Sequence, residues 1–182
     1  MARRREKVIE GLAKKFDWTR GAELGVWKGR TFKHLLNTVP GLHLIGVDLY
    51  APQPDNQGPE KWIPGENGHT WNHDYYFNDI TEFCKNHNGR AKLMRMTTSE
   101  AAELIEDESL DFIFIDADHS YEGCNEDIKK WAPKVKKGGC VMGHDIFWEG
   151  VNKAIRENFG DDFNEEEDKV WWHQKKWVHL IN

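Results

Sequence analysis

The sequence predicts an α/β fold with a doubly wound, mostly parallel sheet and helices on both faces. Short apolar runs alternate with segments of helical periodicity, which is the pattern of strands joined by crossover helices. Acidic or glycine residues follow the ends of these runs, as they do at the ligand edge of such sheets. The length of 182 residues suits one domain with one sizeable core. We therefore expect a single domain over residues 1–182, with a variable insert at about residues 51–78.

The expected helices have apolar residues spaced three or four positions apart. They cover residues 5–16, 29–36, 99–105, 121–131 and 151–159. Pro40 and Gly41 follow the second of these helices and Pro133 follows the fourth, where they stop helical structure. Thr98 or Ser99 is expected to cap the third.

The expected strands are short apolar runs, some of which end on an acid. They cover residues 20–24, 42–48, 91–96, 110–116 and 140–143. The C-terminal tail alternates from Val170 to Leu180 on either side of His173, Gln174 and Lys175. This alternation predicts an antiparallel hairpin that turns at those three polar residues and adds an antiparallel edge to the sheet.

Composition and charge disfavour several classes of protein. Hydrophobic residues make up 38% and charged residues 31%, which is typical of a globular protein. The net charge of −6 disfavours a domain that binds nucleic acid through phosphates. No apolar segment is long enough to span a membrane, and none follows the N-terminal arginines as in a secretory signal. The basic cluster of Arg3, Arg4 and Arg5 is expected to be a solvated terminus.

The cysteine pattern indicates a reducing compartment. Cys84, Cys124 and Cys140 are odd in number and far apart, without the paired spacing of a zinc site or a disulfide framework. Cys140 lies inside an apolar run and is expected to be a small core residue. We therefore expect a cytoplasmic protein.

A glycine-rich turn follows the first expected strand. Glu23, Gly25 and Gly29 form the pattern E-x-G-x-x-x-G. Glycine allows close approach of a ligand and positive φ, and the following helix offers free N–H groups. The next strand ends at Asp48, whose carboxylate can accept the hydroxyls of a ribose. The two signals together predict a nucleoside-type ligand.

Two alternatives remain open for this turn. A dinucleotide-binding fold would show G-x-G-x-x-G, whereas an acid before the first glycine suits a cationic, amino-acid-like ligand better than a pyrophosphate. The other alternative is a turn glycine followed by a glycine that packs a helix, with no ligand at all.

Polar residues also follow two later strands that are expected beside the first. Asp116, Asp118 and His119 follow one strand, and His144 and Asp145 follow the other. Carboxylate and imidazole groups that converge at one sheet edge can hold a divalent ion such as Mg or Mn. A histidine there can take a proton from a substrate hydroxyl near neutral pH. The pattern predicts a catalytic role for Asp116, His119 and Asp145.

Each of these polar residues also has a purely structural interpretation. Asp118 or Ser120 could cap the helix that begins near Tyr121. His144 could be a buried histidine that bonds only to backbone. We favour the structural role for Asp118 and the functional one for Asp116 and Asp145.

These residues and motifs resemble those of the class I S-adenosylmethionine-dependent methyltransferases. The resemblance lies in residues 21–36, in Asp48 and in residues 111–146. The segment IDADHSYEGCNEDIKKWAPKVKKGGCVMGHDI is similar to a branch of small methyltransferases with an I-D-G-D-H-S-Y-E signature. It is also similar to catechol-type O-methyltransferases and to cephalosporin-hydroxylase-like proteins. The resemblance covers most of the chain except about residues 51–78.

The resemblance implies a Rossmann-like, seven-stranded sheet with a C-terminal antiparallel hairpin, and S-adenosylmethionine as cofactor. Glu23 and Gly25 would line its methionine end, Asp48 would hold the ribose, and Thr98 and Ser99 would lie near the adenine. The full set of implied cofactor residues is Glu23, Gly25, Val26, Trp27, Gly29, Thr31, Asp48, Leu49, Thr98, Ser99 and Asp116.

The resemblance also implies a metal site and a catalytic base. Asp116, His144 and Asp145 match the metal-binding positions of the related enzymes, although His144 replaces an acidic ligand. Histidine can still bind manganese, iron or zinc. His119 falls where the catechol enzymes have a lysine base. The implied reaction is direct displacement, in which an acceptor oxygen attacks the methyl carbon in line with the departing sulfur.

The expected function is O-methylation of a small hydroxylated acceptor, either sugar-like or aromatic. Alternatives are another S-adenosylmethionine- or metal-dependent enzyme of this fold, such as a hydroxylase-like relative, or a non-catalytic cofactor-binding protein. A NAD-dependent dehydrogenase is disfavoured by the glycine spacing. No nucleic-acid or membrane partner is expected, and a homo-oligomer is left open.

The insert at residues 51–78 is rich in proline, glycine and aromatic residues. A loop of this length in a compact domain is usually functional or disordered, and its aromatic content argues against disorder. We predict a lid over the acceptor site, with Trp62, Trp71 and Tyr75 as acceptor contacts. The alternative is that these aromatics cover the sheet edge or form an oligomer interface.

Overall fold

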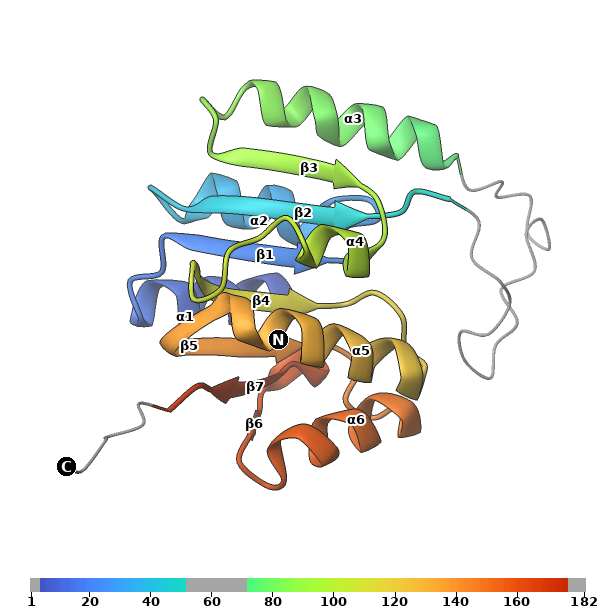
Figure 1. Cartoon of the computed structure of the whole chain (residues 1–182). Coiled ribbons are helices and arrows are strands. Elements are labelled where there is room, and N and C mark those ends of the chain that lie inside the picture. Colours follow the sequence, from blue (N-terminus) through green and yellow to red (C-terminus); the bar gives the residue numbers. More distant parts are fainter. Residues whose placement is uncertain (1–3, 52–71, 177–182) are drawn as a thin grey trace.

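The computed structural model describes residues 4–51 and 72–176, and within them the predicted α/β fold is confirmed. Seven strands form one sheet in the order β3-β2-β1-β4-β5-β7-β6 (Figure 1). The strands are β1 (Arg20–Leu24), β2 (His43–Asp48), β3 (Ala91–Arg95), β4 (Leu110–Ile115), β5 (Val135–Gly143), β6 (Asn164–Glu165) and β7 (Trp171–Gln174). The first five strands pair in parallel, and β7 runs antiparallel to both β5 and β6.

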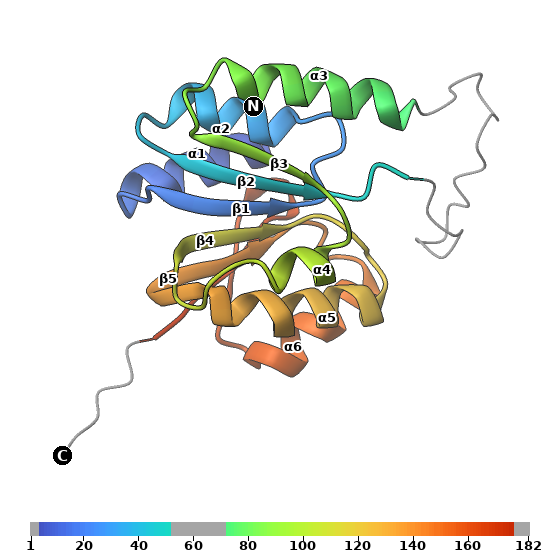
Figure 2. The ribbon, with the colours of Figure 1, turned by 45° about the horizontal axis from the view of Figure 1, so that its top comes forward.

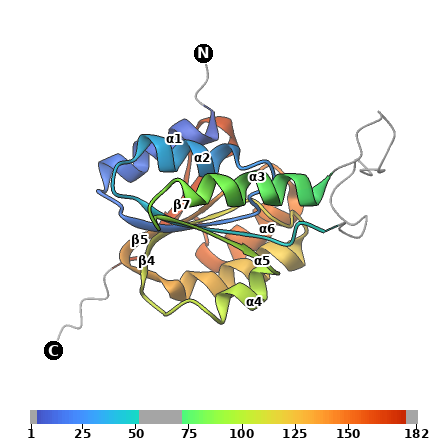
Figure 3. The ribbon, with the colours of Figure 1, turned by 90° about the horizontal axis from the view of Figure 1, so that it is seen from above.

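Helices cover both faces of the sheet, as Figure 3 shows from above. One face carries α1 (Arg5–Lys15), α2 (Arg30–Thr38) and α3 (His73–Lys85). The other face carries α4 (Thr98–Ala102), α5 (Tyr121–Trp131) and α6 (Glu149–Phe159). Two short 3-10 turns, Ala132–Lys134 and Glu167–Lys169, complete the described elements. No helix in the described ranges has both the length and the apolar character that a membrane crossing requires.

The alternation of side chains along the central strand β4 divides the core into two halves. Phe112 and Phe114 face the half built from α1 and α2, where Trp18 stacks on Phe112 at 4.8 Å between ring centroids. Ile113 faces the half built from α4, α5 and α6. There the buried Trp131 donates its indole N–H to the Thr98 carbonyl at 3.0 Å. A buried indole N–H needs such a partner, so this bond fastens α5 to the start of α4.

Most predicted elements are confirmed, but the predicted turn of the C-terminal hairpin is wrong. His173 and Gln174 lie inside β7, opposite Val141 and Cys140 of β5. The antiparallel partner of β7 on its other side is β6, which precedes it in the chain. The polar residues are accommodated in a strand because His173 stacks flat on Phe159 at 4.3 Å. Residues 177–182, the expected second arm, lie outside the described residues.

Other differences concern helix boundaries. The N-cap of α4 is Thr97 rather than Thr98 or Ser99, because Thr97 and Glu100 form a reciprocal capping box. That helix also ends at Ala102, three residues earlier than expected. Helix α3 was not predicted, and its first turn begins at His73, within the predicted insert. Cys140 is fully buried in the core, as expected.

Candidate active site

The carboxyl ends of the central parallel strands form the edge where the site was predicted. Strands β1, β2 and β3 point the same way in Figure 2, and their partners β4 and β5 run parallel to them. Within the sheet, β1 lies between β2 and β4, so the glycine turn after β1 adjoins the residues that follow both neighbours. The predicted cofactor and catalytic residues therefore share one edge of the sheet.

The glycine turn after β1 requires glycine at its first position. Gly25 has φ +85, and a Cβ atom there would lie 2.1 Å from the backbone oxygen of Asp116. The backbone of the turn therefore lies directly against the end of β4, and only glycine fits. Gly29 has φ +71 and forms the N-cap of α2. Val26 is buried, whereas Trp27 is 46% exposed on the turn.

Asp48, at the end of β2, holds this turn through backbone hydrogen bonds. One carboxylate oxygen accepts the Trp27 N–H at 2.8 Å, and the other accepts the Tyr50 N–H at 2.8 Å. Trp27 and Tyr50 both have positive φ, +47 and +46. One carboxylate thus stabilises two residues with strained backbone conformations. Leu49, another predicted cofactor residue, lies between Asp48 and Tyr50 in the chain. Each oxygen of Asp48 keeps a lone pair for a further donor.

Glu23 is a buried acid that has no hydrogen-bond partner for its Oε2 atom within the described residues. Its side chain lies at the end of β1 and is 2% exposed. Burial raises its pKa well above the usual range, and the charge of Asp116 raises it further, against the opposing effect of Arg5. Thr31, on the first turn of α2, is also buried with an unpaired hydroxyl in the described structure.

The second half of the site is a cluster of charged side chains after β4 and β5. Asp116 and Asp145 are its carboxylates, and His119 and His144 are its imidazoles. His119 Nε2 lies 3.1 Å from Asp145 Oδ2 and 3.7 Å from Asp116 Oδ1. His144 Nδ1 lies 3.2 Å from Asp145 Oδ2 and 3.5 Å from Asp116 Oδ1. The His119 ring stacks on Trp148 with centroids 5.6 Å apart. The four predicted residues therefore form one compact group.

The carboxylates shift the protonation of both histidines. Burial alone would lower the pKa of His119, but its interactions with Asp116 and Asp145 outweigh burial and raise the pKa to about 9. The pKa of His144 is raised to about 9 for the same reasons. In turn, these interactions hold the pKa of Asp145 and of Asp116 below their ordinary value, although burial opposes them. The cluster is thus a network of mutually stabilised charges.

Arg5 is a member of this cluster that sequence reasoning missed. Its Nη1 lies 3.2 Å from Asp116 Oδ2 and 3.3 Å from His144 Nδ1. The prediction of a solvated terminus is therefore wrong for Arg5, because helix α1 begins at this residue and turns its side chain toward the sheet edge. No local signal in the sequence marks it, since its partners lie more than a hundred residues away.

A divalent metal was predicted at Asp116, His144 and Asp145. One ligand atom from each of these residues lies within 4.8 Å of the others, so the donor set is compatible with an ion. The same atoms already have cationic neighbours, however. Arg5 contacts Asp116 and His144, and His119 lies against Asp145. The cluster therefore fits a metal in donor type and spacing but already holds positive charge of its own.

Comparison with known sequences decides the family. Residues 22–146, which run from within β1 to just past the end of β5, match the family described as "Methyltransferase domain". The chain belongs to this methyltransferase family. An uncharacterized protein of Sinorhizobium fredii, y4gI, is 32% identical over 84 residues, covering 42% of the chain. The chain spans only 9% of the length of that relative.

Solved structures share the methyltransferase fold at low sequence identity. An O-methyltransferase from Bacillus cereus in complex with SAH is 15% identical, with a TM-score of 0.62 over 92% of this chain and 78% of that one. The calicheamicin methyltransferase CalS11 is 16% identical, with a TM-score of 0.65 over 95% and 80% of the two chains. The O-methyltransferase NovP is 16% identical, with a TM-score of 0.64 over 95% and 80%. At these identities the likeness shows a shared fold.

The remaining predicted residues of the methyltransferase lie around this edge. Thr98 and Ser99 open α4, where the Ser99 hydroxyl donates to Glu126 on α5. Ser120 caps α5 by accepting the Gly123 N–H, so the capping role falls to Ser120. Asp118 accepts the N–H of Ser120 and shapes the turn before that helix.

Tyr75 is the one predicted acceptor contact that the structure describes. It lies on the first turn of α3, is 61% exposed and makes an edge-to-face contact with Tyr76. Trp62 and Trp71 lie outside the described residues, and so does most of the predicted lid. The prediction that the insert covers the acceptor site therefore stays a prediction.

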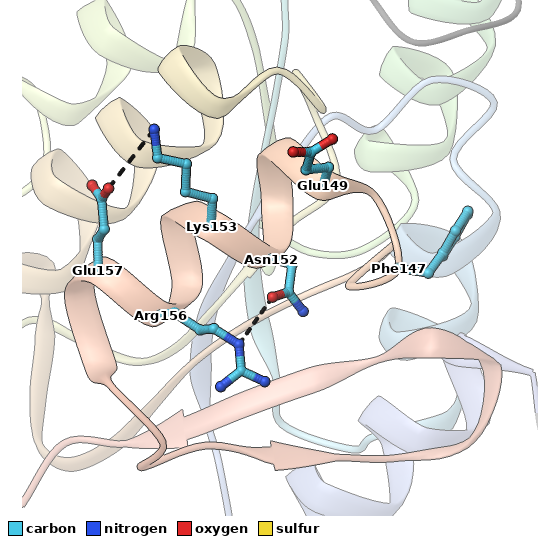
Figure 4. A pocket seen from close by; sticks show the side chains of 6 residues that line it. All are labelled: Phe147, Glu149, Asn152, Lys153, Arg156 and Glu157. Carbon is cyan, nitrogen blue, oxygen red and sulfur yellow. Dashed lines mark hydrogen bonds and ion pairs between the residues drawn. The ribbon is translucent and has the colours of Figure 1, made fainter.

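A surface hollow over α6 is separate from this site (Figure 4). It is lined by Phe147, Glu149, Asn152, Lys153, Arg156 and Glu157. Three of its four charged side chains pair with helical neighbours: Lys153 Nζ lies 3.9 Å from Glu157, and Arg156 donates to Asn152 at 3.0 Å. None of the predicted site residues lines this hollow, so we do not assign the site there.

Proposed function

We propose that this methyltransferase uses S-adenosylmethionine to methylate an oxygen of a small hydroxylated acceptor, either sugar-like or aromatic. One observation carries the proposal: polar atoms that are buried without a partner gather at the carboxyl edge of the sheet. Within the described residues these atoms include Arg5 Nε, Glu23 Oε2, Thr31 Oγ1 and His144 Nε2. Buried polar groups are normally paired, so a group of unpaired ones indicates a missing polar ligand.

The half of the site around β1 and β2 suits the proposed cofactor. Glu23 offers a buried acceptor for the ammonium group of a methionine moiety. Asp48 offers the remaining lone pairs of its two oxygens to ribose hydroxyls. The close approach of Gly25 to β4 leaves no side chain between them at the turn. S-adenosylmethionine supplies an electrophilic methyl group when bound, and the task of this half is to position it.

The half of the site around β4 and β5 suits proton transfer from the acceptor. His119 can take the proton of an acceptor hydroxyl, as the oxygen attacks the methyl carbon, only in its unprotonated form. Because its pKa is raised to about 9, this form is the minor one near neutral pH and becomes more abundant as the pH rises. Asp145 and Asp116, within 3.7 Å of the ring nitrogen, stabilise the imidazolium that results. Trp148 stacks on the ring and limits its rotation. We assign catalytic roles to His119, Asp145 and Asp116 on this basis.

Titration calorimetry with S-adenosylmethionine tests the cofactor assignment. We expect saturable 1:1 binding by the wild-type chain and loss of binding in Glu23→Gln, because an amide cannot ionise beside an ammonium group as the buried carboxyl can. Glu103→Gln is the matched control, since Glu103 is an exposed acid at the end of α4. Failure of the wild-type chain to bind, with or without added Mn²⁺, would overturn the proposal.

A metal-dependent enzyme of the same fold, such as a hydroxylase-like relative, is the second candidate function. The observation that favours it is the spacing of Asp116, His144 and Asp145. The two candidates differ in their products. A methyltransferase releases S-adenosylhomocysteine in proportion to the acceptor that is consumed. Mass spectrometry would then show that the acceptor has gained roughly 14 mass units, because a methyl group has replaced a hydrogen. An acceptor that gains oxygen instead would support the second candidate.

We place the enzyme in the cytoplasm, acting on a free small molecule. Support comes from Cys124 and Cys140, which are buried, unpaired thiols. Burial raises the pKa of each thiol to about 12, so neither is reactive. The net charge of −6 supports an acceptor that is not a nucleic acid.

A further inference from the structure

Arg5 brings a permanent positive charge to the carboxylate–histidine cluster. Its guanidinium contacts Asp116 at 3.2 Å and His144 at 3.3 Å, which are two of the three residues with metal-ligand spacing. The Arg5 side chain is 23% exposed and that of Asp116 is 11% exposed, so the ion pair is largely shielded from solvent. Arginine stays protonated at all ordinary pH values, so this charge is always present.

The position of Arg5 is fixed by contacts of the helix that carries it. The Arg5 backbone N–H donates to Asp168 Oδ2 at 2.8 Å, which ties the start of α1 to the turn before β7. One residue later, Glu6 accepts two hydrogen bonds from Arg30 at 3.1 and 2.7 Å, which ties α1 to α2. The guanidinium therefore belongs to an anchored helix, and the cluster is its only ion-pair partner among the described residues.

A divalent ion and the Arg5 guanidinium compete for the same atoms. An ion bound by Asp116 and His144 would lie about 2.1 Å from their ligand atoms. It would then lie within a few ångströms of the guanidinium that contacts both residues, where like charges repel strongly. Coordination by His144 Nδ1 would also displace the Arg5 N–H that faces this nitrogen.

We propose that Arg5 is the permanent cation of this cluster, takes the place of a divalent metal and keeps the site metal-free. The inference deepens the proposed function. It rests on that function in one respect, the role of the cluster in activating the acceptor. Metal binding itself can be measured without cofactor or acceptor. The two claims can therefore fail separately.

The test measures Mn²⁺ binding to protein from which metals have first been removed with a chelator. Electron paramagnetic resonance measures the concentration of free Mn²⁺. Wild type is compared with Arg5→Gln, and Lys7→Gln is the matched control. Lys7 is a cation on the same turn of α1, but it pairs with Glu10 and is 56% exposed. We expect Arg5→Gln to bind Mn²⁺ at least about tenfold more tightly than wild type and Lys7→Gln.

Two further variants locate the site and protect the test against misfolding. Arg5→Gln combined with Asp145→Asn should lose the gained Mn²⁺ binding, which places the ion at this cluster. Arg5→Lys keeps the charge and should exclude Mn²⁺ as wild type does. Wild type that binds one Mn²⁺ at micromolar concentration overturns the inference, even if Arg5→Gln does not fold. Equal binding, or none, in wild type and a folded Arg5→Gln also overturns it.

Calorimetry with S-adenosylmethionine on the same preparations separates this inference from the proposed function. If Arg5→Gln gains Mn²⁺ binding while wild type fails to bind the cofactor, the inference stands and the proposed function is wrong. If wild type binds the cofactor and also binds Mn²⁺ tightly, the proposed function stands and the inference is wrong.

Discussion

The two halves of the candidate site are held together by different kinds of interaction. The half around Gly25 and Asp48 is built from backbone: a glycine with positive φ lies against β4, and one carboxylate accepts two backbone N–H groups. The half around Asp116 and Asp145 is built from side-chain charges, and Arg5 reaches His144 across 139 residues of sequence. The first half depends on local conformation and the second on the balance of distant charges.

This difference predicts how each half responds to change. Backbone geometry responds to steric changes and hardly to pH or salt. A charged cluster responds to the loss of any one member, because the remaining charges are left buried and unpaired. Substitutions in the first half should therefore affect folding and cofactor binding together. Substitutions in the second should affect turnover or Mn²⁺ binding, and lower the stability of the fold by unpairing charges rather than by distorting the backbone of the glycine turn.

The largest effect is expected for His119→Gln, in the charged half. Loss of the proton acceptor should lower acceptor turnover about 10²–10⁴-fold, which is the usual contribution of general acid–base catalysis. Affinity for S-adenosylmethionine should stay unchanged, because Glu23, Gly25 and Asp48 lie in the other half and Asp116 is left in place. Steady-state kinetics and calorimetry measure the two effects.

His43→Gln is the matched control for this variant. His43 is exposed at the start of β2, at the opposite end of the strand from Asp48. Turnover by His119→Gln at the wild-type rate would exclude His119 as the base. A parallel loss of cofactor affinity would instead show that the two halves are not separable.

The second effect concerns Gly25→Ala, in the backbone-built half. The new Cβ would lie 2.1 Å from the Asp116 carbonyl oxygen at a φ of +85. We expect a loss of about 3 kcal/mol in the free energy of unfolding, from the clash together with the backbone strain. Cofactor binding should fall below detection. Urea denaturation and calorimetry measure these outcomes.

Gly89→Ala separates the two causes. Gly89 also has positive φ, +76, but a Cβ atom there has no neighbour within 4 Å. This control should lose only about 1–2 kcal/mol, the conformational cost of the left-handed region. Equal losses of unfolding free energy in both variants would mean that the clash with the end of β4 contributes nothing to the destabilisation.

The sequence predicted the sheet and the backbone-built half well because their signals are local. Apolar runs that end on Glu23, Asp48 and Asp116 correspond to β1, β2 and β4. The helix predicted at residues 121–131 matches α5 at both ends. In each case a strand, a turn and a helix start lie within a few residues of one another, so periodicity and capping identify them.

The features that the sequence analysis missed depend on partners far away in the sequence, or have a local pattern that neighbouring residues obscured. Nothing near Arg5 in the sequence indicates Asp116 as its partner. The β7 strand depends on pairing with β5, which overrides the turn preference of His173 and Gln174. Helix α3 had a usable signal, because Tyr76, Ile80 and Phe83 recur at helical spacing, but the proline-rich stretch before it suggested a loop.

A smaller effect is expected for Asp48→Asn, which weakens the turn without a clash. The amide keeps one acceptor oxygen but places an NH₂ group toward the other backbone N–H. We expect a loss of about 1–3 kcal/mol in cofactor binding, the cost of leaving one donor unpaired. Calorimetry measures this loss.

Asp107→Asn is the control for Asp48→Asn, since Asp107 is an exposed acid that pairs only with Lys134 in the described structure. Turnover at saturating cofactor should stay near the wild-type value, because the charged half is untouched. A strong loss of turnover at saturation would contradict the division into two halves.

The smallest effect is expected for Glu10→Gln, on the helix that carries Arg5. Burial alone would raise the pKa of Glu10, but its bonds with Lys14, Lys7 and His34 lower the pKa to about 2 from the ordinary value of 4.5. The carboxylate therefore stabilises the folded chain fully above pH 4.5, and this contribution is lost as the pH falls toward 2.

We expect Glu10→Gln to lower the free energy of unfolding by about 1 kcal/mol near neutral pH, since its partners are partly exposed. The difference from wild type should shrink through the window between pH 4.5 and pH 2, as urea denaturation at several pH values would measure. Glu82→Gln, an exposed member of a pair with Lys85, should show almost no difference at any pH.

Because Glu10 joins α1 to His34 of α2 at 2.7 Å, a loosened α1 should also release Arg5 and raise Mn²⁺ affinity slightly. Unchanged Mn²⁺ affinity in Glu10→Gln would mean that Asp168 and Glu6 suffice to hold Arg5 at the cluster.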